Sequence, residues 1–130
     1  MSPARLALVV LAVADLARAR AFYDAAFGWP VEVDVAVYVE YTLPAGLRLG
    51  LYERAGFARN TGEPPASSPP AGTTATELYL FPDDLSAAIE RVEAAGARAL
   101  SPRAPRDWGD EAAYFADPDG NVLVLAGPLI

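Results

Sequence analysis

The side chains that most often do chemistry at neutral pH are missing from this chain. Its 130 residues contain no histidine and no cysteine, and all ten basic residues are arginine. A thiol nucleophile, a disulfide, a thiolate metal site and the usual neutral-pH base are therefore excluded. Carboxylates, arginines and aromatic rings are left for binding or for proton transfer.

The composition narrows the class of partner. Apolar residues make up 53% of the chain and the formal net charge is −7, which favours one folded domain and disfavours nucleic acid and anionic membranes. No apolar run approaches the roughly 20 residues that span a bilayer, so we expect a soluble, cytoplasmic protein. Arg5 and the apolar segment 6–14 also fit a secretory signal, but Asp15 is placed to cap a helix.

The elements that position these side chains occur in two similar halves. An apolar run over 6–13 predicts a strand, and Asp15 is placed to cap the helix that follows it. Apolar residues at helical spacing predict that this helix continues until Gly28. Alternation and turn residues then predict strands over 31–41 and 47–53, with a turn at 44–46. The second half repeats this order, with a strand over 77–81, a cap at Asp83 or Asp84, a helix closed by Gly96, and strands over 97–100, 112–116 and 121–125.

Two segments are expected to connect these elements. Residues 56–74 are rich in proline, glycine and serine and predict an exposed connector, neither helix nor strand, between module one (about 5–55) and module two (about 75–130). Residues 117–121, Asp-Pro-Asp-Gly-Asn, place proline and glycine where a tight turn needs them. They predict a hairpin turn between the last two strands.

Several of these segments together carry a family resemblance. The motifs are residues 15–23 with Gly28 and Trp29, residues 84–85 with 94–97, Trp108-Gly109-Asp110, and residues 115–121. Together they resemble the vicinal oxygen chelate superfamily, which includes glyoxalase I, bleomycin-resistance proteins, extradiol dioxygenases and methylmalonyl-CoA epimerase. The resemblance implies an α+β fold of two βαβββ modules, a curved mixed sheet with a central cleft, and a homodimer. A fold alone supplies no reaction.

The resemblance also implies where a metal ion would be bound. Metal-dependent relatives take ligands from the first and last strands of each module, and the matching positions here are Leu8, about Gly50, Glu77 and Val124. Only Glu77 can donate a ligand, whereas a catalytic divalent site typically uses three protein donors. We therefore expect no metal and no cofactor.

Side-chain alternation along strands predicts what lines the cleft instead. Whether Tyr38 and Glu40 also line one edge stays open, because the register of 31–41 is ambiguous by one residue. Trp108 lies on a loop that relatives use at the cleft mouth, although it could also cover a sheet edge or a dimer seam. The predicted ligand-binding residues are Leu8, Val10, Arg48, Tyr52, Glu77, Tyr79, Phe81, Trp108, Val122 and Val124.

These residues leave three interpretations. The working hypothesis is a protein similar to the bleomycin-resistance branch, which sequesters a hydrophobic or cationic small molecule without metal. The alternative is a glyoxalase-, dioxygenase- or epimerase-type enzyme in which Glu77 is the base or the single metal anchor. In the third, the apolar strand residues fill a collapsed core and the chain is a structural or accessory subunit whose cleft binds nothing. Separately, Glu77 is open to interpretation as a structural acid paired with Arg48 or Arg5.

Overall fold

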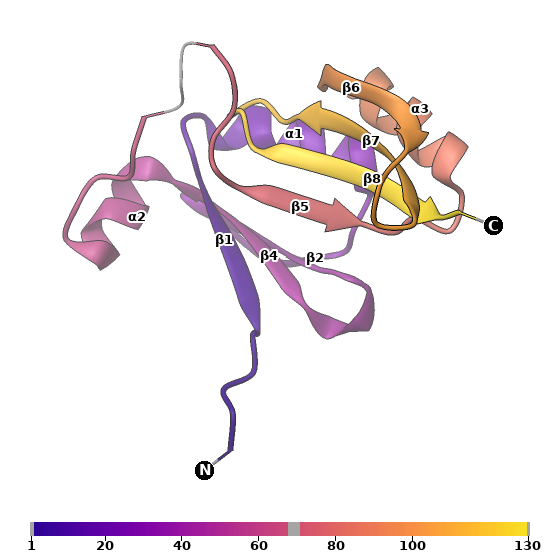
Figure 1. Cartoon of the computed structure of the whole chain (residues 1–130). Coiled ribbons are helices and arrows are strands. Elements are labelled where there is room, and N and C mark those ends of the chain that lie inside the picture. Colours follow the sequence, from indigo (N-terminus) through magenta and orange to yellow (C-terminus); the bar gives the residue numbers. More distant parts are fainter. Residues whose placement is uncertain (1, 68–70, 130) are drawn as a thin grey trace. The chain divides into compact units, whose positions relative to one another are not determined.

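The computed structural model of the chain describes residues 2–67 and 71–129. Its contacts divide the chain into two units, which are described separately: Met1–Arg20 with Gly28–Ala66, and Ala21–Phe27 with Ser67–Ile130. Each unit holds a mixed sheet of four strands (Figure 1). Along the sequence, the elements form two successive βαβββ modules, as predicted.

The sheet of the first unit has the strand order β1-β4-β3-β2. Its edge strand β1 is parallel to β4, and β3 is antiparallel to both of its neighbours. The predicted cap is confirmed, because Asp15 Oδ1 accepts a hydrogen bond of 3.0 Å from the Arg18 amide in the first turn of α1. The elements of this module are β1 (Leu8–Val13), α1 (Leu16–Phe27), β2 (Val31–Val35), β3 (Tyr38–Thr42) and β4 (Arg48–Glu53).

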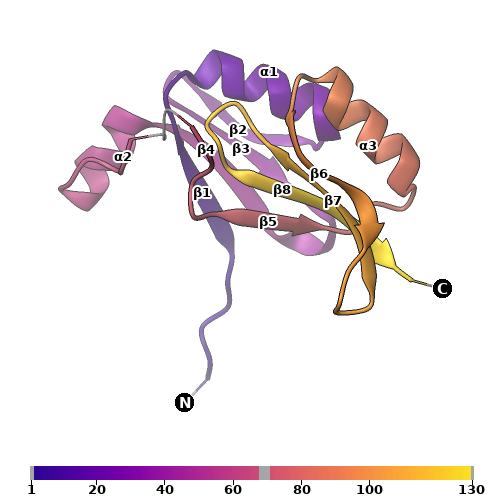
Figure 2. The ribbon, with the colours of Figure 1, turned by 45° about the horizontal axis from the view of Figure 1, so that its top comes forward.

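The sheet of the second unit repeats this plan in the order β5-β8-β7-β6. Strand β5 is parallel to β8, and β7 is antiparallel to β8 and β6. Of the two predicted caps for α3, Asp84 is the one used, since its Oδ1 accepts from the Ala87 amide at 3.0 Å. Figure 2 shows α3 beside this sheet, and it contacts β8. The elements are β5 (Glu77–Leu80), α3 (Leu85–Ala94), β6 (Arg98–Pro105), β7 (Asp110–Ala116) and β8 (Val122–Pro128).

The prediction of a connector without regular structure is wrong at its start. Helix α2 (Arg54–Thr61) follows β4 directly and contacts β4 and β1. Good helix formers such as Ala58 and Arg59 outweigh the single Gly56, and the helix stops at Gly62, whose φ of 83° is left-handed. Beyond it, residues 62–67 and 71–76 form no helix or strand, and 68–70 lie outside the described residues.

The predicted hairpin turn between β7 and β8 is confirmed and is more elaborate than the turn residues alone require. The Asp117 amide donates to the Asn121 carbonyl at 2.9 Å, which closes the turn. The buried Asp117 carboxylate also accepts from the amides of Asp119 and Asn121, each at 2.9 Å, and from Asn121 Nδ2 at 3.1 Å. Tyr23 of α1, fully buried, donates its hydroxyl to the same carboxylate at 2.6 Å.

In the described part of the chain, no helix combines the length and the apolar character that a membrane crossing requires.

Candidate functional site

The register of the first sheet gathers several predicted site residues on one face. Leu8 and Val10 of β1 stand opposite Arg48 and Gly50 of β4, and paired residues share a face. The register of β3 settles the ambiguity left by the sequence, because Glu40 pairs with Gly50 and Tyr38 with Tyr52. Tyr38 and Glu40 therefore lie on the same face as Arg48 and Tyr52.

A buried carboxylate organises this face. Glu40 is only 6% exposed, and a buried carboxylate is tolerated only when it is well paired. Its Oε1 accepts from the Tyr38 hydroxyl at 2.6 Å, and its Oε2 accepts from Arg48 Nη1 at 3.0 Å. We call Tyr38, Glu40 and Arg48 the Glu40 triad.

Gly50 makes room for this arrangement. A Cβ atom built on Gly50 would lie 2.7 and 2.8 Å from two ring carbons of Tyr38, closer than real side chains approach, and still nearer to its hydroxyl oxygen. The Tyr38 ring thus occupies the space that a side chain at position 50 would need, and its edge packs against Tyr52 with ring centroids 5.2 Å apart. The sequence identified position 50 but gave no sign of what fills it.

Burial of the Tyr38 hydroxyl, followed by its hydrogen bond to Glu40 and the Glu40 charge, raises the pKa of Tyr38 well above its ordinary value. The phenol of the unfolded chain ionises near pH 10, whereas the phenol of the folded protein keeps its proton at that pH. The stabilising contribution of the protonated phenol should therefore be complete below pH 10 and decline as the pH rises above it.

We expect Tyr38→Phe to leave the folded protein's phenolate absorbance up to about pH 11 unchanged, because Tyr38 does not contribute to it there. Ultraviolet titration of both proteins, folded and in denaturant, measures this. The denatured variant should show one phenolate fewer than the denatured wild type. A smaller absorbance rise in the folded variant would show that Tyr38 ionises normally.

The second sheet collects the other predicted residues on one face of its own. Glu77 and Tyr79 of β5 stand opposite Val122 and Val124 of β8, and Val124 stands opposite Tyr114 of β7. Val124 is fully buried with Ala112 and Ala126, and Tyr79, Tyr114 and Val122 pack against them. Val124 therefore belongs to the buried cluster on which Tyr79 and Tyr114 pack.

Trp108, Tyr79 and Asp110 form a hydrogen-bonded chain on this unit. The indole Nε1 of Trp108 donates to the Tyr79 hydroxyl at 2.7 Å, and that hydroxyl donates to Asp110 Oδ2 at 2.6 Å. Burial, followed by the bond to Asp110, raises the pKa of Tyr79, so the phenol stays a donor. Phe81 packs edge-on against Tyr79 at 5.6 Å between centroids. We call Tyr79, Phe81, Trp108 and Asp110 the Trp108 cluster.

Two rings of this cluster, those of Trp108 and Phe81, are exposed in the second unit. Trp108 is 57% exposed and Phe81, directly after β5, is 65% exposed. The hydrogen bond fixes the indole without covering it. The sequence singled out Trp108, Tyr79 and Phe81 but not Asp110 as a partner, although Asp110 follows Trp108 by two residues.

Arg106 is a residue that the sequence analysis missed. Its Nη2 donates to the carbonyls of Pro102 and Ala112, each at 2.9 Å, and its guanidinium carbon lies 4.9 Å from the centre of the Tyr114 ring. Its amide donates to the Asp110 carbonyl at 2.7 Å, which closes the loop that carries Trp108. Arg106 thus ties β6 and β7 together beside the cluster.

Glu77 stands apart from these networks. It is exposed at the first position of β5, and its side chain has no ion pair or hydrogen bond within the described part of its unit. The suggested partner Arg48 is engaged by Glu40 and lies 3.9 Å from Glu32 in its own sheet. Pairing of Glu77 with Arg48 or Arg5 joins two separately described units and stays a prediction.

The residues at the four metal-ligand positions do not fit a divalent ion. Leu8, Gly50 and Val124 carry no donor atom, and Tyr38 occupies the space beside Gly50. Over 2–67 and 71–129, no three acidic side chains come close enough together to hold a metal ion. Glu77 alone offers fewer donors than such a site needs.

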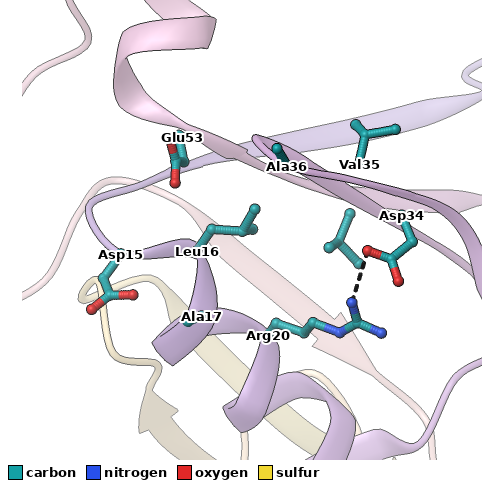
Figure 3. Close-up of a pocket in the computed structure, with 9 residues that line it drawn as sticks. Asp15, Leu16, Ala17, Arg20, Asp34, Val35, Ala36 and Glu53 are labelled. Atoms are coloured by element: carbon teal, nitrogen blue, oxygen red, sulfur yellow. Dashed lines mark ion pairs between the residues drawn. The ribbon is translucent and has the colours of Figure 1, made fainter.

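A separate cavity of about 530 Å³ lies in the first unit, between α1 and the β2–β3 hairpin (Figure 3). Asp15 and Glu53 lie at one end of it. Its apolar lining consists of Leu16, Ala17, Val35, Ala36 and Val39. At the other end Arg20 and Asp34 form an ion pair of 2.9 Å. None of the residues predicted to bind ligand lines this cavity.

Comparison with solved structures supports the fold over nearly the whole chain. A glyoxalase-related enzyme from Fulvimarina pelagi superposes with a TM-score of 0.81 at 24% identity, covering 94% of this chain and 86% of that one. A glyoxalase/bleomycin resistance protein/dioxygenase from Nocardioides gives 0.81 at 23% identity, with 99% and 86% covered. A lactoylglutathione lyase from Agrobacterium tumefaciens gives 0.73 at 20% identity, with 96% and 94% covered.

At these identities the likeness shows the fold and not the activity. No curated protein matches the chain significantly. The model of the glyoxalase-like domain matches residues 8–126, which include both βαβββ modules. This chain therefore belongs to the glyoxalase-like family of the vicinal oxygen chelate superfamily.

Proposed function

We propose that this chain binds a small hydrophobic or cationic molecule without a metal ion and sequesters it, as members of the bleomycin-resistance branch do. The observation that carries the proposal is the Trp108 cluster. It presents an indole and a phenyl ring to solvent, 57% and 65% exposed, on a hydrogen-bonded base. Exposed rings held in a fixed orientation suit a flat or cationic ligand.

The charge of the cluster supports a cation in particular. Asp110 uses Oδ2 for Tyr79, and its Oδ1 has no protein donor among the residues described. A carboxylate beside aromatic faces attracts an ammonium or a charged heterocycle, and the net charge of −7 adds a long-range attraction. The donor-poor positions Leu8, Gly50 and Val124 support binding without metal.

The alternative is an enzyme that uses Glu77. Its carboxylate is exposed and unpaired within its unit, and alternation along β5 places it on the face that carries Tyr79. A general base must reach the proton it removes, so this proposal requires the ligand to lie over the start of β5.

The test uses the two tryptophans of the chain. In a Trp29→Phe background, only Trp108 reports on binding. We expect benzyltrimethylammonium to quench this fluorescence saturably and benzyl alcohol, its uncharged control, to bind more weakly. Trp108→Ala, followed by calorimetry, should lower the affinity about tenfold, the size of a well-placed cation–π contact.

Trp29→Phe serves as the matched control, because Trp29 packs on Tyr41 in the first unit at 6.2 Å between centroids. It should leave the affinity unchanged. Equal affinities before and after removal of Trp108 would reject the cluster as the binding site. Saturable stabilisation of the protein by manganese, nickel or zinc would reject the metal-free model, and turnover that is lost in Glu77→Gln would favour the enzyme.

We also propose that the chain forms a homodimer and that the protein is cytoplasmic. Light scattering of the purified chain tests the first, and a monomer at all concentrations would reject it.

A further inference from the structure

The Glu40 triad leaves one further hydrogen-bond donor and one acceptor on its face of the first sheet. The Tyr38 hydroxyl gives its proton to Glu40 at 2.6 Å, so its oxygen can only accept a further hydrogen bond. Arg48 gives Nη1 to Glu40 at 3.0 Å, and its Nη2 lies 3.9 Å from Glu32, beyond hydrogen-bond distance. Nη2 is therefore available to donate.

Both groups are fixed before any ligand arrives. Glu40 is nearly buried and holds Tyr38 with one oxygen and Arg48 with the other, while the close approach over Gly50 and the edge of Tyr52 fix the Tyr38 ring. The Arg48 side chain is nevertheless 48% exposed. A donor and an acceptor held in place in this way lower the entropic cost of binding.

The local charge decides which ligand group fits. Glu40 balances the charge of Arg48, and Glu32 adds a further negative charge close by. An anion would be repelled by the two carboxylates, and a cation would compete with Arg48 for Glu40. An uncharged group that both accepts and donates hydrogen bonds meets neither penalty.

We propose that the Glu40 triad recognises a carboxamide or lactam group of a small molecule, whose carbonyl accepts from Arg48 and whose N–H donates to Tyr38. This inference rests on the proposed small-molecule function and concerns the face of the first sheet alone. It adds Tyr38 and Glu40 to the predicted residues Arg48 and Tyr52, and it makes Gly50 a positioning residue through the Tyr38 ring.

The test compares three probes of one shape: benzamide, benzoate and benzylammonium. Amide ¹H–¹⁵N spectra should show saturable shifts at residues 38–42 and 48–52 with benzamide and weaker ones with the two charged probes. Arg48→Met should weaken benzamide binding at least tenfold, and Tyr38→Phe, which keeps the ring, about fivefold, as expected for lost hydrogen bonds.

Arg59→Met is the matched control, because Arg59 is an exposed arginine on α2, and it should leave benzamide binding unchanged. Circular dichroism checks that each variant is folded, and Arg48→Lys, which keeps the charge, provides a second variant if Arg48→Met unfolds. Its benzamide affinity should fall less than that of Arg48→Met, since it retains a donor.

Tighter binding of benzoate or benzylammonium than of benzamide at these residues would overturn the inference, and so would an unchanged affinity in Tyr38→Phe. Absence of shifts at 38–52 overturns it as well, and leaves the proposed function standing if benzyltrimethylammonium still quenches Trp108. If benzamide binds but benzyltrimethylammonium does not quench Trp108, the proposal that the Trp108 cluster binds a cation is rejected instead.

Discussion

Asp117→Ala should destabilise the protein more than any other single substitution considered for this chain, by about 3 kcal/mol or more. The buried Asp117 carboxylate accepts four hydrogen bonds, from Tyr23, from the amides of Asp119 and Asn121, and from Asn121 Nδ2. Alanine leaves these donors without an acceptor, and a buried donor without a partner costs about 1–3 kcal/mol.

Urea unfolding followed by circular dichroism measures this loss, and the melting temperature should fall by roughly 10 °C. Tyr23→Phe removes only one of the four donors and should cost about 1 kcal/mol. Asp83→Ala, at an exposed position, is the matched control and should stay within about 0.5 kcal/mol of the wild type. An Asp117→Ala protein as stable as the control would mean that the backbone alone holds the turn.

Gly50→Val should cost about 3 kcal/mol and release Tyr38 from Glu40. A Cβ at this position would lie 2.7 Å from the Tyr38 ring, so the ring must swing away. Overpacking costs about 1–3 kcal/mol, and the loss of one partner of the buried Glu40 carboxylate adds a similar amount. The free energy of unfolding and the near-ultraviolet circular dichroism of the tyrosines should both change.

Gly127→Ala in β8 is the matched control, because its Cβ would meet Leu85 at 3.9 Å, an ordinary contact. It should behave like the wild type. Tyr38→Ala placed in the Gly50→Val protein should cost far less than Tyr38→Ala alone, since the ring has already left its place. Additive effects of the two substitutions would show that the ring does not lie over Gly50.

The fold could be predicted from the sequence because its signals are local. Apolar runs, the caps Asp15 and Asp84 and the turn at 117–121 each depend on residues close in the chain, and each occurs as predicted. Several strand boundaries differ. Strand β1 begins at Leu8 and leaves Leu6 67% exposed, whereas β6 continues to Pro105 and β8 to Pro128. In β6, a register shift between Ser101 and Ala104 accommodates Pro102.

The site could be predicted only in part, because its contacts depend on register and on rings that cross from one strand to the next. Alternation correctly grouped Leu8 with Val10, Arg48 with Tyr52, and Glu77 with Tyr79. It could not show that Glu40 joins Tyr38 to Arg48, since a shift of one residue in β3 would have reversed its faces. Nor could it show that Arg106 reaches Tyr114.

Helix α1 is divided between the two compact units of the chain. By sequence it belongs to the first repeat, yet its segment Ala21–Phe27 belongs to the second compact unit, where Tyr23 bonds Asp117. A fragment that ended at Ala66 would keep Tyr23 but lose Asp117, the acceptor of its hydroxyl proton. The apparent duplication is thus not a pair of detachable halves, because the second compact unit takes part of its interior from the helix of the first repeat.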